Sequence, residues 1–159
     1  MKIHIIGGPG SGKTTLARQL SEKYGIARYD LDDLMWDNAK TYGTKRDQKE
    51  RAALLDAILS KDDWIIEGVY YAWCGQCFAD ADRIYLLEVP RRTYRRRIVR
   101  RFLKRKIGLE QGKKETLRSL KELLDWADHY REVNLPAIRT ILAQYPEKTA
   151  GCGDFAGTH

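Results

Sequence analysis

The sequence of 159 residues contains no run of about 18 apolar residues, and this excludes a helix that spans a membrane. Residues 1–6 are apolar over too short a stretch for a signal peptide, and a glycine-rich loop follows where a cleavage site would stand. No internal repeat or linker interrupts the chain. We therefore expect a single domain in the cytoplasm, since a hydrophobic content of 43% excludes a disordered chain.

The sequence is also poor in cysteine, with three residues in all. This odd number, in a chain without an export signal, predicts reduced thiols. Cys74 and Cys77 form a C-x-x-C pair, but a zinc site needs two more ligands, and the candidates left are Cys152 and His159. No thioredoxin pattern surrounds the pair. The sequence therefore favours neither a zinc site nor a redox motif, and the role of the pair stays open.

The net charge is +7, and positive charge is concentrated in one segment. Residues 91–118 hold 13 Lys or Arg against two Glu, a local charge of +11, which leaves −4 for the remainder of the chain. Such a segment attracts phosphates, whether these belong to a nucleotide, a nucleic acid or a lipid surface. A solvated helix face is the alternative interpretation, and composition alone does not separate the two.

Short β-branched runs alternate with segments of helical periodicity. Strands are expected at residues 2–6, 27–29, 64–66 and 83–89. Helices are expected at residues 13–23, 47–59, 91–106 and 117–145, the last interrupted or kinked at Pro136. This alternation predicts a three-layer α/β/α fold with a parallel sheet. Residues 149–159 lack periodicity and are expected to form a poorly ordered tail, although a fifth edge strand near residues 147–152 stays open.

Residues 7–14 match G-x-x-x-x-G-K-[ST], the motif of a phosphate-binding loop, between an expected strand and an expected helix. Glycines permit the backbone conformations in which successive N–H groups converge on phosphates, and the helix adds its positive N-terminal dipole. Lys13 can bridge the β- and γ-phosphates, and the Thr14 hydroxyl can bind Mg²⁺. The residues expected to bind the nucleotide are Gly8, Pro9, Gly10, Ser11, Gly12, Lys13, Thr14 and Thr15.

Several classes of nucleotide-binding protein use such a loop, and two of them are excluded by missing motifs. GTPases need the guanine-reading motif N-K-x-D, which this sequence lacks. Transport-type ATPases need the signature L-S-G-G-Q, which is also missing. A small kinase or a regulatory ATPase that uses ATP and Mg²⁺ remains.

Acidic residues follow two of the expected strands, and the carboxyl ends of parallel strands face the ligand. Asp30, Asp32 and Asp33 follow the second strand, and we expect Asp30 or Asp32 to hold Mg²⁺ or to accept the proton of an acceptor hydroxyl. The alternative is that one of them caps the following helix. Glu67, at the end of the third strand, is a further candidate ligand for Mg²⁺ together with Thr14 and Asp32.

Arg97 and Arg101 lie four residues apart in the basic helix and share a face, so both could contact a phosphate group during its transfer. The other arginines of this helix cannot all point the same way. Several of them must form a solvated surface or contact a nucleic acid. The candidates for a nucleic-acid contact are Arg95, Arg96 and Arg100.

Residues 1–145 resemble the adenylate-kinase-related P-loop proteins, a nucleoside-monophosphate-kinase-like group, and within it the DNA topology modulation proteins. The segments that carry the resemblance are 7–15, 29–34, 64–68, 81–86 and 89–101. The resemblance implies a parallel sheet of order 2-3-1-4-5 and a mobile lid, expected near residues 102–115 of a single domain 1–148. It also implies that Arg97 and Arg101, at the ends of an R-x-x-x-R stretch, contact ATP phosphates.

The D-x-D of shikimate kinases, which serves Mg²⁺ and the acceptor hydroxyl, resembles Asp30 and Asp32. One segment departs from the adenylate kinases, because their D-G-[FY]-P-R reads E-G-V-Y-Y at residues 67–71. The missing Pro and Arg argue against AMP as the acceptor. Some adenylate kinases bind zinc with a C-x-x-C pair in the lid, but Cys74 and Cys77 precede the fourth expected strand, so that role does not transfer.

Two hypotheses follow from the sequence. In the first, the chain is an Mg·ATP-dependent kinase that transfers the γ-phosphoryl group to a nucleotide or another small hydroxylated acceptor. Lys13, Arg97 and Arg101 would stabilise the transferring group, and Asp30 or Asp32 would orient the acceptor. In the second, it is a nucleic-acid-associated ATP-binding protein that uses the basic segment 91–118.

Overall fold

The computed structural model describes residues 1–41, 43–109 and 116–152, in which strands alternate with helices. The strands are β1 (Lys2–Gly7), β2 (Arg28–Asp30), β3 (Trp64–Gly68), β4 (Arg83–Leu87) and β5 (Thr149–Cys152). The helices are α1 (Lys13–Tyr24), α2 (Leu31–Met35), α3 (Gln48–Leu59), α4 (Gly75–Asp80), α5 (Arg91–Lys106), α6 (Leu117–His129) and α7 (Leu135–Leu142). One π-helical turn, η1 (Tyr130–Asn134), joins α6 to α7.

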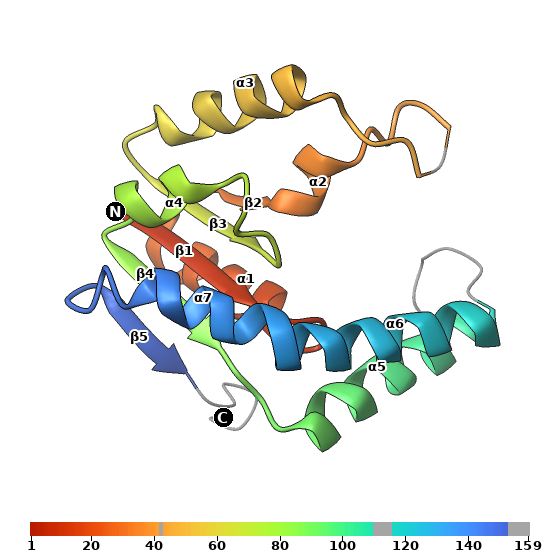
Figure 1. Cartoon of the computed structure of the whole chain (residues 1–159). Coiled ribbons are helices and arrows are strands. Elements are labelled where there is room, and N and C mark those ends of the chain that lie inside the picture. The colour runs from red at the N-terminus through yellow and green to blue at the C-terminus, as the bar shows by residue number, and fades with distance from the viewer. Residues whose placement is uncertain (42, 110–115, 153–159) are drawn as a thin grey trace.

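The five strands form one sheet of order β2-β3-β1-β4-β5, as the resemblance implied. Every neighbouring pair is parallel. The carboxyl ends of all strands therefore lie at one edge, where the loops that follow β1, β2, β3 and β4 begin (Figure 1). This edge is the place where a parallel sheet binds its ligands.

The fifth strand, which the sequence left open, is present. Thr149–Cys152 pair in parallel with β4, with Ala150 beside Tyr85. Residues 149–152 therefore belong to the sheet and not to the poorly ordered tail in which the sequence placed them. The backbone ladder with β4 holds this edge strand, and four residues are too few to show the periodicity of a strand in the sequence. The rest of that tail, residues 153–159, lies outside the described residues.

Alternate residues of β1 enter two different layers of the core. Ile3 and Ile5 pack with Leu16 and Ala17 of α1 on one face of the sheet. On the other face, Ile6 belongs to a larger cluster to which α2, α3, α4 and α7 contribute. Helices thus cover both faces, and the predicted three-layer fold is confirmed.

Cys74 and Cys77 lie inside this larger cluster, at the start of α4. Both thiols are reduced and fully buried, and the Cys74 Sγ atom donates a hydrogen bond to the Tyr70 carbonyl at 3.0 Å. A hydrogen bond with Cys77, together with burial, raises the pKa of the Cys74 thiol. The C-x-x-C pair is therefore part of the hydrophobic core.

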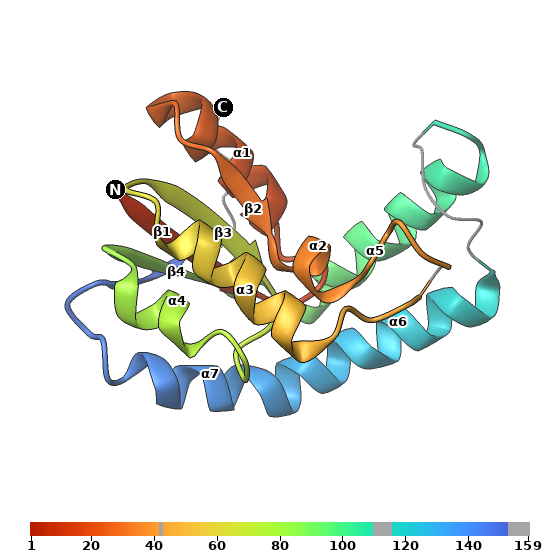
Figure 2. The same cartoon turned by 90° about the horizontal axis from the view of Figure 1, so that it is seen from above.

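Helices α5 and α6 lie side by side and extend away from the sheet in both views (Figures 1 and 2). A cluster that includes Tyr94 and Ile98 of α5 and Ala127 of α6 holds them together. The basic helix ends at Lys106, where the sequence predicted its end. Residues 102–106 of the expected lid are therefore helical, with Phe102 buried, and residues 110–115 lie outside the described part of the chain.

The helix expected at residues 117–145 is divided by the π-helical turn and not sharply kinked at Pro136. In this turn the Leu135 N–H group bonds to the Tyr130 carbonyl, five residues earlier. Pro136 then occupies the first turn of α7, a position that tolerates its missing N–H group. Figure 2 shows α6 and α7 as one continuous rod, so the π turn accommodates the proline without redirecting the chain.

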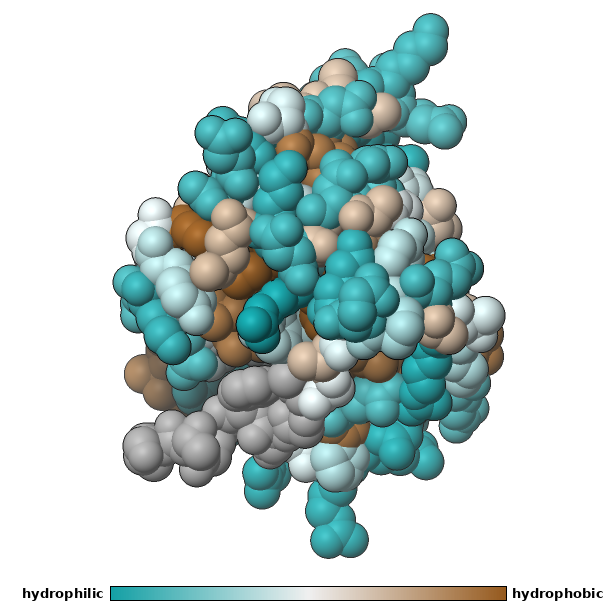
Figure 3. All heavy atoms as spheres, turned by 90° about the vertical axis from the view of Figure 1, so that its left-hand side faces the viewer, coloured by the Kyte–Doolittle hydropathy of each residue, from teal (hydrophilic) through white to brown (hydrophobic). Residues whose placement is uncertain are grey.

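No helix in the described residues is long and apolar enough to cross a membrane. Figure 3 shows one outer face covered mostly by hydrophilic side chains, with smaller hydrophobic areas between them. The large apolar side chains are instead gathered between the sheet and its helices.

His4 supplies a test of this packing, because it is a fully buried titratable residue in the central strand. Its Nδ1 atom lies 3.1 Å from the Ile66 carbonyl oxygen, and its ring meets Phe78 edge-on at 4.7 Å. Burial lowers the pKa of His4 from 6.5 to about 4. The unfolded chain therefore binds a proton between these two values that the folded chain does not, and folding stability is lost as the pH falls through this window.

We predict that the free energy of unfolding attributable to His4 falls by about 2 kcal/mol between pH 7.5 and pH 5. Urea denaturation of the wild type and of His4→Leu at both pH values measures it, because the variant lacks this titration. The wild type should lose about 2 kcal/mol more than the variant. Equal losses in the two proteins would show that His4 is not buried as described.

Candidate functional site

The loop between β1 and α1 has the backbone that a phosphate site requires. Gly10 and Gly12 adopt φ angles of 71° and 96°, in the left-handed region that favours glycine. A Cβ atom on Gly10 would lie 2.9 Å from the Tyr94 carbonyl oxygen, so α5 packs closely on the loop. Gly12 precedes α1 and has no side chain with which to cap it. The N–H groups at the start of this 12-residue helix are therefore available to an anion.

The Lys13 side chain folds back towards Gly8 at the start of this loop. Its Nζ atom donates a hydrogen bond to the Gly8 carbonyl at 2.8 Å, and the residue is only 9% exposed. Burial lowers the pKa of Lys13, whereas the nearby carboxylates of Glu67 and Asp30 raise it. The ammonium group is thus held at the loop at a cost in solvation, which a bound phosphate would offset.

Thr14 and Glu67 form the second polar contact of the site. The Thr14 hydroxyl donates a hydrogen bond to Glu67 Oε1 at 2.6 Å, and Glu67 is 2% exposed. Across the ladder between β2 and β3, Asp30 pairs directly with Glu67. A hydroxyl and carboxylates are the hard oxygen ligands that Mg²⁺ prefers, usually one or two from protein with the rest from water and phosphate. Thr14 and Glu67 therefore fit a magnesium ion that accompanies a phosphate ligand.

Asp30 caps α2, as the alternative interpretation of the acidic residues suggested. Its carboxylate accepts a hydrogen bond from the Asp32 N–H group at 2.8 Å, and the helix starts at once with Leu31. The cap does not remove Asp30 from the site, because the residue also lines the cavity described below. Burial, and then the neighbouring charges of Glu67, Asp32 and Asp33, raise the pKa of Asp30 to about 6.

Asp32 is held by a residue that the sequence did not single out. The Tyr70 hydroxyl donates a hydrogen bond to Asp32 Oδ1 at 2.7 Å. Burial and this hydrogen bond raise the pKa of Tyr70, so the hydroxyl keeps its proton. Tyr70 lies just after the carboxyl end of β3, as Asp30 and Asp32 lie at and just after the end of β2, and this position was the signal that could have identified it.

These residues line one cavity with a volume of about 660 Å³. It extends from the phosphate-binding loop to the aromatic side chains of Trp36, Tyr70 and Trp126. Its described lining residues are Pro9, Gly10, Gly12, Lys13, Thr14, Thr15, Asp30, Asp32, Trp36, Glu67, Gly68, Val69, Tyr70, Ile98, Arg101, Arg105, Leu123 and Trp126. This volume is in the range of small-molecule sites in proteins.

Tyr130, in the π-helical turn, packs against the phosphate-binding loop. Its hydroxyl donates to the Val69 carbonyl at 2.7 Å, and a Cβ atom on Gly8 would lie 3.0 Å from its ring. The π turn thus places a buried aromatic residue between the phosphate-binding loop and the segment after β3. The local periodicity of the sequence gave no sign of this turn.

Arg97 and Arg101 lie at the site, whereas Arg91 and Arg95 are engaged in a contact with α6. Arg97 Nη1 donates to the Gly10 carbonyl at 3.2 Å, and Arg101 lines the cavity. By contrast, Arg91 and Arg95 both contact Asp128 of α6, which also accepts a hydrogen bond from the Tyr94 hydroxyl. Of the three arginines considered for nucleic acid, Arg95 is thus half-buried in a helix contact, while Arg96 and Arg100 are exposed.

The chain is similar to several known proteins. A family model described as an AAA domain matches residues 3–129. The chain is 31% identical over 99 residues to a cytidylate kinase of Desulfurococcus amylolyticus, which covers 54% of this chain and 53% of that protein. It is 36% identical over 93 residues to an adenylate kinase of Magnetococcus marinus, with 58% and 42% covered. The chain thus spans about half the length of these relatives.

The fold is also similar to that of a solved shikimate kinase from Bacteroides thetaiotaomicron. The two structures share a TM-score of 0.57 and 21% sequence identity, over 86% of this chain and 79% of that one. At this identity the similarity concerns the fold alone, and the fold is that of P-loop kinases.

The raised pKa of Asp30 leads to a testable prediction. An NMR titration of the aspartate carboxyl carbons should give Asp30 a midpoint near pH 6. Glu67→Gln should move this midpoint down, because it removes a neighbouring negative charge while keeping an oxygen for Thr14. Asp62→Asn, on the exposed turn before β3, is the matched control and should not change it.

The same group affects folding stability in the opposite direction to His4. The folded chain keeps the Asp30 proton above the ordinary pKa of 3.8, so the contribution of Asp30 to stability is lost as the pH rises through about 6. A midpoint near 4 in the wild type, or an unchanged midpoint in Glu67→Gln, would contradict the described proximity of these carboxyls.

Proposed function

The chain belongs to the AAA domain family over residues 3–129, and from this membership and its site we propose that it is a phosphotransferase. It binds Mg·ATP and transfers the γ-phosphoryl group to the hydroxyl group of a small acceptor. One observation carries the proposal: Lys13, Thr14 and Arg101 line the same cavity as the carboxylates of Asp30 and Asp32. A phosphate donor and a hydroxyl acceptor can therefore meet there.

The donor half of the cavity holds ATP through backbone and cationic groups. The N–H groups of the loop and of the first turn of α1, to which Pro9 contributes none, would bind the β- and γ-phosphates. Lys13 exchanges the Gly8 carbonyl for a phosphate oxygen, and Arg97 and Arg101 add charge from α5. A magnesium ion held by Thr14 and Glu67 would neutralise part of the charge on the phosphates. Such preorganised charges stabilise the transferring group more than the ground state.

The acceptor half of the cavity supplies a base. Asp30, with its pKa near 6, is largely ionised at neutral pH and can accept the proton of a hydroxyl group. Asp32 lies two residues further on and is oriented by Tyr70. Either carboxylate can orient an acceptor towards the γ-phosphate.

The alternative hypothesis, a nucleic-acid contact by α5, has less support. Arg91 and Arg95 are ion-paired with Asp128 and bind α5 to α6. The remaining exposed arginines of the predicted contact are Arg96 and Arg100. Nucleic-acid binding, the closer resemblance to DNA topology modulation proteins and the location in the cytoplasm stay predictions.

The proposed function is tested by ADP release in the presence of a panel of nucleosides, nucleotides and small hydroxylated compounds. We expect at least one of them to stimulate ADP release from Mg·ATP. If Mg·ATP binds and no compound of the panel stimulates ADP release, the chain is a nucleotide-binding protein and not a phosphotransferase.

Lys13→Ala tests the donor half. Removing one such preorganised charge should lower turnover by about 10²–10³-fold. Stability without nucleotide should change little, because the lysine is buried at a cost and its loss relieves that cost. Thermal unfolding with and without Mg·ATP measures both effects, and Lys23→Ala, at the other end of α1, is the matched control.

The expected pattern is a variant that melts like the wild type but is not stabilised by Mg·ATP. If Mg·ATP stabilises Lys13→Ala as strongly as Lys23→Ala, the phosphate-binding loop is wrongly assigned.

A further inference from the structure

The charged side chains that line the cavity come from different elements. The cations that line it are Lys13, Arg101 and Arg105, which come from the phosphate-binding loop and α5. The segment from the end of β2 through α2 and the segment after β3 contribute Asp30, Asp32, Trp36 and Tyr70, which together form the acceptor wall. Among the described lining residues, no Lys or Arg comes from these two segments.

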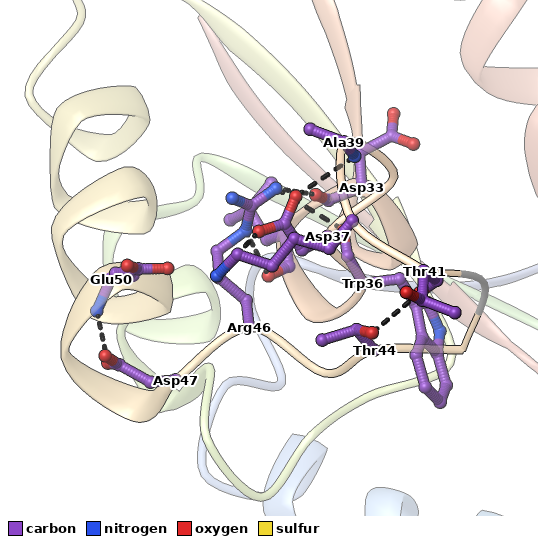
Figure 4. Close-up of polar contacts among 11 residues, drawn as sticks. Asp33, Trp36, Asp37, Ala39, Thr41, Thr44, Arg46, Asp47 and Glu50 are labelled. Atoms are coloured by element: carbon purple, nitrogen blue, oxygen red, sulfur yellow. Dashed lines mark hydrogen bonds and ion pairs between the residues drawn. The ribbon is translucent and has the colours of Figure 1, made fainter.

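Arg46, ten residues after Trp36, is committed to backbone groups. Arg46 donates from Nε to the Leu34 carbonyl at 3.2 Å and from Nη2 to the carbonyls of Asp33 and Trp36 at 3.2 and 3.3 Å. Figure 4 shows its guanidinium group among these atoms, at the end of α2. Because the last carbonyls of a helix need donors, Arg46 stabilises the end of α2 and is not positioned for a ligand.

Three further basic side chains of this region contact protein groups. The Arg51 guanidinium lies 4.5 Å from the centre of the Trp73 ring, and its Nη1 is 3.4 Å from Met35 Sδ. Lys40 forms an ion pair with Asp37 at 3.3 Å. The Lys45 ammonium group lies 5.8 Å from the centre of the Trp36 ring, and Lys45 does not line the cavity.

An anionic acceptor would meet repulsion at this wall. A phosphate or carboxylate near Asp30 and Asp32 would face two like charges, and Asp30 is partly buried, where charges interact more strongly than in water. The Trp36 and Tyr70 rings, in contrast, offer apolar faces to a ring. Discrimination of this kind comes from repulsion of the wrong ligand as much as from attraction of the right one.

We infer that the acceptor is a hydroxylated ring compound without phosphate or carboxylate groups, neutral or cationic, and that Asp32 and Trp36 determine this specificity. The inference rests on the proposed function and names the substrate class of the same site. In the transfer, the acceptor oxygen forms a bond to the γ-phosphorus and gives its proton to an Asp carboxylate. The bond from the γ-phosphorus to the bridging oxygen breaks, and ADP leaves with the electron pair.

The first test does not depend on knowing the acceptor. Diadenosine pentaphosphate carries enough phosphates to reach from an ATP site into a site for a nucleoside monophosphate. If the acceptor wall repels phosphate, this compound binds in the presence of Mg²⁺ less than about fivefold more tightly than ATP. Titration calorimetry measures both dissociation constants. Tighter binding, by more than about fivefold, would overturn the inference.

Two variants test whether Asp32 is the residue that repels the phosphates of diadenosine pentaphosphate. Asp32→Asn should increase the affinity for diadenosine pentaphosphate relative to ATP several-fold, because it removes a negative charge from the wall. Asp33→Asn, an exposed neighbour that does not line the cavity, is the matched control and should leave the ratio nearly unchanged. Equal ratios in the two variants would remove Asp32 from the proposed specificity.

The second test uses matched pairs of acceptors that differ in one charged group, such as nucleosides with their 5′-monophosphates and amino sugars with their own phosphate esters. ADP release should be stimulated only by the members without the anionic group. Stimulation by an anionic member overturns the acceptor class and leaves the proposed function standing. Stimulation by no member, or failure of ATP itself to bind, would instead contradict the proposed function.

Discussion

The parallel pairing of β1, β3 and β2 is the constraint on which the site depends. Because β1 and β3 run in the same direction, the phosphate-binding loop after β1 and Glu67 at the end of β3 reach the same edge. The next pairing sets Asp30 directly beside Glu67. A one-residue change of register would turn these carboxyl groups to the other face of the sheet. The contact between Thr14 and Glu67 therefore reports the register of the central strands.

At this edge of the sheet, positively and negatively charged side chains lie close together and are partly buried. Lys13 and Glu67 are both buried, and burial shifts the pKa values of Lys13 and Asp30 in opposite directions, each towards its uncharged form. Helix α5 adds Arg97 at the loop, and Asp128 fixes that helix against α6 through Arg91 and Arg95. The structure thus holds its charges before a ligand arrives, which reduces the reorganisation needed on binding.

Sequence reasoning succeeded where a feature depends on local spacing. The phosphate-binding loop, the alternation of strands and helices and the common face of Arg97 and Arg101 all follow from short-range patterns. It failed where a feature depends on a distant partner. The strand at Thr149–Cys152 forms because its backbone pairs with that of β4.

The same reason explains the missed side chains. Nothing near Tyr70 in the sequence shows that its hydroxyl meets Asp32, 38 residues away. The pairing of Arg91 and Arg95 with Asp128 depends on how α5 packs on α6, so the sequence could not tell these arginines from those that remain exposed.

The most direct measurement of the central claim is an NMR titration of ¹⁵N-labelled protein with the magnesium complex of a non-hydrolysable ATP analogue. If phosphates bind at the N-terminus of α1, the largest amide shifts should fall on Gly10, Gly12, Lys13 and Thr14. Saturable binding with shifts confined to other parts of the chain, and unchanged amides in this loop, would contradict the account.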